Sequence, residues 1–89
     1  MFKKMRGVHL PYRTQGLIFF TCLNYQTQPP DVQHKIVNAC LEVGKDNYQA
    51  LFEFLTTDHG AQELALKHYI DATQLYRLRR EFYEKFADN

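Results

Sequence analysis

The sequence contains no tryptophan, only two cysteines and four glycines, and no long hydrophobic run. The glycines are too dispersed to build a glycine-rich loop that could cradle phosphates. Cys22 and Cys40 have no CxxC partner, which excludes the usual spacing of a zinc site or a redox motif. We therefore expect both cysteines to be small buried hydrophobic residues, with a disulfide between them as the open alternative.

The longest apolar run, Leu17–Phe20, is interrupted at Thr21. Lys3, Lys4 and Arg6 precede it as the charged region of a signal peptide would, but the run is too short for a signal sequence and far too short to span a bilayer. The sequence therefore predicts a cytoplasmic protein with no membrane partner.

Charge of one sign is also missing, because 11 Lys and Arg residues face 10 Asp and Glu residues, for a net charge of +1. The charges are unevenly distributed along the chain. Residues 1–16 hold four basic residues and no acidic one, 17–60 hold two basic and five acidic, and 61–89 hold five of each. The acidic middle is typical of a scaffold, and the basic residues at the two ends are the candidates for contacting an anionic partner.

With 89 residues, 45% of them hydrophobic, the chain is long enough for one core but not for a two-lobed catalytic architecture. Apolar spacings of three and four predict an all-α fold, a small bundle of four to five helices in a single domain over 1–89. Residues 1–11 are interpreted as a basic N-terminal arm. The helices are expected at 12–25, 32–43, 47–56, 61–68 and 72–86.

Turn residues suggest where these helices begin and end. We expect Asp31 and Asp71 to cap the helices that follow them, and Gly44 to end the helix before it. Asp46 with Gln49 resembles a capping pair.

The segment 61–86 has the apolar spacing of a helix-turn-helix unit. With Ala61 as the first position, apolar or small side chains fall at positions four, five, ten, fifteen and eighteen, as the motif requires. The turn position usually given to glycine is Tyr69, which does not easily take a left-handed conformation. We therefore expect a turn unlike the simplest repressor type, with Tyr69 partly in the core.

The outward positions of the last helix suit the major groove of DNA. Arginine offers paired donors to guanine, glutamine can pair with adenine, and hydroxyl groups suit phosphate. A helix face that is simply exposed to solvent gives the same pattern, so the alternative that these residues bind nothing stays open. The candidate DNA-binding residues are Thr73, Gln74, Tyr76, Arg77 and Arg80, with Lys3, Lys4 and Arg6 of the arm contacting phosphate or the minor groove.

Leu51–Leu55 followed by 61–86 resembles the region-four helix-turn-helix of sigma factors, and more closely the sigma-like regulators of bacteriophages and mobile elements, including late-gene activators. The resemblance covers 51–86 and rests on Leu64-Ala65, Tyr69-Ile70-Asp71, Gln74-Leu75-Tyr76-Arg77 and Arg80-Glu81-Phe82. Many of these relatives also lack the turn glycine. Asp71 stands where Ser or Thr usually caps, and Gln74 where Thr is common. The resemblance implies a transcription regulator with its recognition helix at about 72–86.

Other chemistry finds little support in the sequence. The four histidines are not paired at helical spacing, and Asp58-His59 has no Ser or Cys nucleophile beside it. We therefore predict no metal, no cofactor and no enzyme activity. Double-stranded DNA is the expected partner; a homodimer formed through 17–25 and contact with RNA polymerase or another protein are further partners left open. The alternative function is a small helical protein-interaction module, an inhibitor or adaptor, on a helix-turn-helix scaffold.

Overall fold

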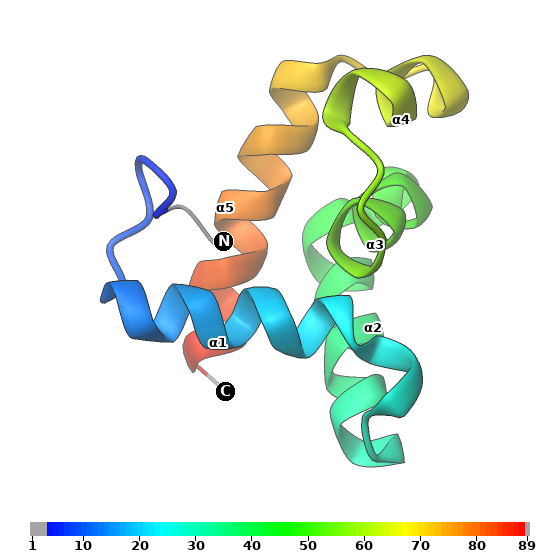
Figure 1. The fold of residues 1–89 in the computed structure, drawn as a ribbon. Helices are drawn as coiled ribbons and strands as arrows, with labels where there is room; N and C mark the ends of the chain where they lie inside the picture. The colour runs from blue at the N-terminus through cyan, green and yellow to red at the C-terminus, as the bar shows by residue number, and fades with distance from the viewer. Residues whose placement is uncertain (1–3, 89) are drawn as a thin grey trace.

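The computed structural model describes residues 4–88 and shows an all-α protein, which confirms the fold class expected from the sequence. Two 3-10 turns, η1 (Tyr25–Thr27) and η2 (Lys45–Asn47), join the first three helices. Within the described range there are five α-helices: α1 (Tyr12–Leu23), α2 (Pro30–Gly44), α3 (Tyr48–Thr56), α4 (Ala61–His68) and α5 (Ala72–Asp88) (Figure 1).

The longest helix, α5, is in contact with all four others. Figure 1 shows α1 crossing the C-terminal half of α5, while α4 lies at the N-terminal end of α5. The main core fills the space between α1, α2, α3 and α5. Cys22 and Cys40 are buried in it as free thiols, which confirms the prediction of two small buried residues and excludes the disulfide. Its other fully buried members include Ile36, Leu51, Phe82 and Tyr83.

A second, smaller core attaches α4 to the rest of the protein. Leu64 of α4 and Leu75 of α5 are fully buried against Ala50 of α3. Ile70, in the turn between α4 and α5, packs against both cores. The position of α4 therefore depends on a few apolar contacts and on the polar contacts that supplement them.

α2 ends at Gly44 as predicted, but neither of its ends is formed in the predicted way. Pro30 begins α2, so Asp31 lies inside its first turn and makes no capping hydrogen bond, although a carboxylate there still suits the helix dipole. Gly44 keeps helical angles, and the positive φ of 50° falls on Lys45. Gly44 is buried, and a Cβ atom added to it would lie 3.4 Å from Cβ of Tyr48, so glycine is used there for space.

The capping pair predicted at the start of α3 is also absent. Asn47 precedes the helix without a side-chain cap, and the amide of Gln49 instead donates to the hydroxyl of Tyr48. The cap predicted for α5 is present, because Asp71 accepts a 2.8 Å hydrogen bond from the backbone N–H of Thr73. α4 begins and ends where the sequence predicted.

The turn between α4 and α5 contradicts both expectations for Tyr69. Tyr69 adopts the left-handed conformation, with φ 56° and ψ 45°, and it is 97% exposed rather than partly in the core. The N–H of Ile70 donates to the carbonyl of Ala65, a six-to-one hydrogen bond that closes the helix end. The backbone strain of a left-handed tyrosine is tolerated because this hydrogen bond and the burial of Ile70 fix the backbone. The exposed side chain of Tyr69 adds no steric clash with the rest of the protein.

A polar cluster joins α4 to α3. One carboxylate oxygen of Glu53 lies 2.8 Å from Nε2 of His68, and Nζ of Lys67 is 3.0 Å from both oxygens. Hydrogen bonds from Lys67 and then from His68 hold the pKa of Glu53 below its usual range. The ionised carboxylate thus links the last turn of α4 to the middle of α3.

Replacing Tyr69 with glycine is expected to stabilise the protein. Glycine removes the steric cost of the left-handed residue, which exceeds the entropy that it adds to the unfolded chain, so the free energy of unfolding should rise by roughly 0.5–1 kcal/mol. Chemical denaturation measures this change. Tyr69→Ala is the control, because alanine removes the ring but keeps the strain and should give no gain. A loss of stability in Tyr69→Gly would contradict the left-handed turn.

The Glu53 cluster predicts a loss of stability in acid. Because the pKa of Glu53 is lower in the folded protein, its contribution is complete above about pH 4.3, the unfolded value, and is lost as the pH falls through the folded pKa. Glu53→Gln should cost roughly 1 kcal/mol at neutral pH, with the difference from wild type shrinking in acid.

The matched control is the exposed pair of His59 and Glu63, whose side chains lie 2.9 Å apart. Glu63→Gln should change the free energy of unfolding very little, because solvent screens that pair. Urea denaturation of the three proteins between neutral and acid pH makes the comparison. Equal effects of the two substitutions at neutral pH would show that Glu53 does not secure α4.

Candidate functional site

The predicted DNA-binding residues of α5 do not share one face of the helix. Thr73, Arg77 and Arg80 recur at i, i+4 and i+7 and form a single stripe, which we call the basic stripe. Gln74 and Tyr76 are two positions apart, so they point about 160° away from each other, one to each side of this stripe. The structure therefore brings three of the five residues together and separates the other two.

The basic stripe occupies the side of α5 away from the main core. Thr73 and Arg77 are exposed, and Arg77 makes only a loose contact with Glu81, at 3.8 Å between Nη1 and Oε2. Both side chains of this pair are open to solvent, so the contact does not hold the guanidinium in place. Arg77 is thus free to bind an external acceptor.

The N-terminal segment packs beside the C-terminal half of α5. A Cβ atom added to Gly7 would lie 3.1 Å from Cδ of Arg80, and the backbone N–H of His9 donates to Glu84 at 3.2 Å. Gly7 has a φ of 78°, so both its backbone angle and its closeness to Arg80 favour glycine. The exposed Lys4 and Arg6 thus belong to a segment held next to the basic stripe.

Gln15 of α1 organises this segment. Its side chain is completely buried and accepts a 2.8 Å hydrogen bond from the N–H of Met5. Its amide donates to the carbonyls of Leu10, at 2.9 Å, and Val8, at 3.5 Å. With the side chain of Val8 also buried, residues 4–11 form an ordered loop. Sequence reasoning missed Gln15, and Lys3, the remaining predicted residue, lies outside the described residues.

Tyr76 packs toward α3. Its ring meets Phe54 edge-on, with 5.7 Å between the ring centroids, and the guanidinium of Arg79 lies over both rings at 4.7 and 5.3 Å. Burial lowers the pKa of Arg79, and its Nε is buried with no hydrogen-bond partner among residues 4–88. This aromatic and cationic stack fastens α5 to α3. Arg79 could have been found from the sequence, because it follows Leu75 by four positions on the buried side.

Gln74 faces a polar depression of about 400 Å³ between α5 and the end of α2 with η2. Arg77 and Glu81 also line this depression, opposite Glu42 and Asp46. Lys45 lines it too, so the charges of the depression are mixed, and Gln74 is half-buried there whereas Arg77 is exposed.

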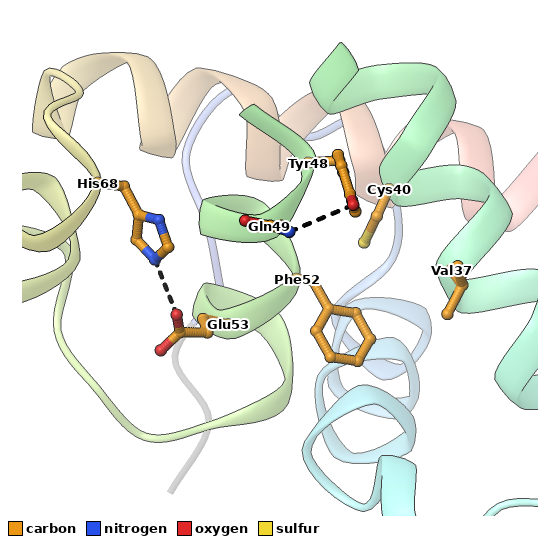
Figure 2. A pocket seen from close by; sticks show the side chains of 7 residues that line it. All are labelled: Val37, Cys40, Tyr48, Gln49, Phe52, Glu53 and His68. Atoms are coloured by element: carbon orange, nitrogen blue, oxygen red, sulfur yellow. Dashed lines mark hydrogen bonds and ion pairs between the residues drawn. The ribbon is translucent and has the colours of Figure 1, made fainter. Parts of the chain in front are cut away.

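A second, mostly apolar pocket of about 350 Å³ lies between α2, α3 and α4. Figure 2 shows Glu53 and His68 facing each other on one side and Phe52 and Cys40 toward the other. Burial raises the pKa of Cys40 to about 12, so the thiol stays protonated at neutral pH and is a poor nucleophile. The pocket therefore offers apolar binding space, and its carboxylate and imidazole serve to join α3 and α4.

Two structural features are absent from residues 4–88. No group of three or more His, Cys, Asp or Glu side chains in this part of the chain is placed to hold a metal ion. No helix among the same residues is long and apolar enough to cross a membrane.

The comparisons with known proteins leave the local geometry as the basis for any functional conclusion. Neither protein-family models, nor curated proteins, nor solved structures give a match to this chain.

Proposed function

We propose that this protein binds double-stranded DNA sequence-specifically and acts as a transcriptional regulator of the phage or mobile-element type. In this proposal α4, the turn at 69–71 and α5 form a helix-turn-helix unit, and α5 enters the major groove. The observation that carries the proposal is the contact of Gly7 with Arg80, which sets the exposed Lys4 and Arg6 of the N-terminal segment beside the basic stripe.

Thr73 and Arg77, the exposed members of the basic stripe, supply the base contacts in this proposal. Arg77 can donate two hydrogen bonds to a guanine edge, and Thr73, one turn earlier, suits a phosphate or a base. Asp71 directs its carboxylate to the N–H of Thr73, so it caps the helix and is not proposed to contact bases. Tyr76 packs on Phe54 and so helps to position α5, and Gln74 is half-buried in the depression beside α2, so neither is proposed to contact bases.

The turn geometry also supports a helix-turn-helix unit. Counting from Ala61, Tyr69 falls at the ninth position, which is usually given to glycine, and it adopts the left-handed conformation that glycine would supply there. The sequence resemblance to sigma-like regulators agrees with this turn and leaves RNA polymerase as a protein partner to be tested.

A specific observation favours the second candidate, a small protein-interaction module acting as an inhibitor or adaptor. Leu66 and Tyr69, at the end of α4, are 81% and 97% exposed and present apolar surface to solvent. A module of this kind would need no DNA, so retention on DNA separates the two candidates.

Arg77→Gln is expected to weaken binding to the preferred duplex by about 1–3 kcal/mol, because it removes the paired donors to one base. The preferred site comes from selection on random duplex DNA, and fluorescence anisotropy measures the affinities. The matched control is Lys35→Gln, which also removes one positive charge, but from α2, where Lys35 lies over the ring of Phe86 near the far end of α5. Equal losses for the two variants would contradict base recognition by Arg77.

Lys4→Gln is expected to weaken binding to all duplexes evenly and to lower the slope of log K against log salt by about one, because one phosphate contact is lost. Titrations of preferred and scrambled duplexes over a range of salt concentrations measure this slope. If Arg77→Gln and Lys4→Gln both leave retention on DNA unchanged at low salt, the DNA proposal fails and the interaction module is favoured.

A further inference from the structure

One face of α1 is apolar and exposed, and its single charge is that of Arg13. Leu17 is 69% exposed and Phe20 is 49% exposed, and they share a stripe with Arg13 and Asn24 at i, i+4, i+7 and i+11. Residues 14–30 contain no charged side chain, so Arg13 is the single charge on this stripe. We call Arg13, Leu17, Phe20 and Asn24 the α1 stripe.

The α1 stripe belongs to a helix that is firmly packed on its other side. Ile18 and Cys22 of α1 are buried in the main core. Phe19 packs against the same core and meets Phe20 edge-on, with 5.0 Å between the ring centroids. The exposed ring is therefore held in one orientation before any partner arrives, which lowers the entropic cost of binding.

The location of the α1 stripe argues against DNA as its partner. In Figure 1, α1 lies across the lower half of the molecule and α4, with the first turns of α5, lies at the upper end. Leu17 and Phe20 offer nothing to phosphate groups or anionic lipid headgroups, and one cation, Arg13, is too little for a basic patch. A partner with an apolar and uncharged surface fits this face best.

We propose that the α1 stripe is covered by the α1 stripe of a second copy of this chain, with the two helices antiparallel about a two-fold axis. The spacing of the stripe suits such a pairing. Leu17 and Phe20 lie at equal distances on either side of one point of α1, and Arg13 and Asn24 lie at equal distances from the same point. Leu17 of one copy packs on Phe20 of the other, and the contact is made twice, as two-fold symmetry requires.

Charge and hydrogen bonding select the antiparallel arrangement. A parallel pair would place the two Arg13 side chains together, whereas the antiparallel pair separates them by about 16 Å along the helices. Each Arg13 then meets the negative C-terminal end of the other α1. The amide of Asn24 donates to the carbonyl of Phe20 at 2.8 Å, which leaves its side-chain oxygen as an acceptor for Arg13 of the second copy.

The size of the face sets the strength of the dimer. α1 has 12 residues, so the paired helices bury less surface than a standard permanent interface. The dimer is therefore concentration-dependent, with a dissociation constant on the order of micromolar. It forms without DNA, so its test is independent of the proposed function.

Sedimentation velocity over a range of protein concentrations tests the proposal with two matched variants. Leu17→Asp puts like charges into the face and should raise the dimer dissociation constant at least about tenfold. Leu41→Asp is the control, because Leu41 is an exposed leucine of α2 outside the α1 stripe, and it should leave the constant unchanged. Circular dichroism checks that both variants keep the helical content of the wild type.

A wild type that stays monomeric at all concentrations overturns the proposal, and so does an equal effect of the two aspartates. Cross-linking with a short bis-maleimide then tests the orientation. A mixture of Arg13→Cys and Asn24→Cys chains should link, whereas neither variant alone should, and the buried Cys22 and Cys40 keep the wild type unlinked. Efficient linking of Arg13→Cys alone would show a parallel pair and overturn the arrangement proposed.

Discussion

The burial of one side of α5 is the constraint on which the other features depend, because it fixes the rotation of the helix about its own axis. Leu75, Leu78, Phe82 and Phe86 are buried, and a helix advances by about 100° per residue. Three nearby arginines consequently meet three environments. Arg77 faces solvent, Arg79 is turned inward onto aromatic rings, and Arg80 lies under the N-terminal segment. A different rotation would expose a different set of cations.

The two halves of α5 also differ in charge. The first half presents Thr73 and Arg77, whereas Glu81 and Glu84 follow in the second half. Glu84 accepts the N–H of His9, so part of this negative charge is used to hold the N-terminal segment in place. A protein with a net charge of +1 can therefore offer a local basic surface, provided that its partner meets the first half of α5.

The sequence predicted those features that depend on apolar spacing, and missed those that depend on particular contacts outside the repeating pattern. The helices and the buried residues of α5 follow from a repeating pattern. The left-handed conformation of Tyr69 was missed because it depends on the burial of Ile70 against both cores, which belongs to the tertiary structure, as well as on the local hydrogen bond from Ile70 to Ala65. The role of Gln15 was missed because its partners lie 5 to 10 residues away in an irregular segment, and that of Glu53 because its partners lie on another helix. Position in a pattern also failed to separate Arg77 from Gln74 and Tyr76, because the outward positions of a helix acquire different neighbours once it is packed.

The hydrogen bonds of Gln15 also affect how readily a protease can cleave the N-terminal segment. A protease needs several residues in an extended conformation within its cleft, so exposure of one side chain does not make a peptide bond cleavable. Residues 4–11 can leave the protein only when the three hydrogen bonds of Gln15 break and Val8 leaves the core in the same event. The bonds after Lys4 and Arg6 therefore lie in a segment that opens as one cooperative unit, and their susceptibility to trypsin reports the free energy of that opening.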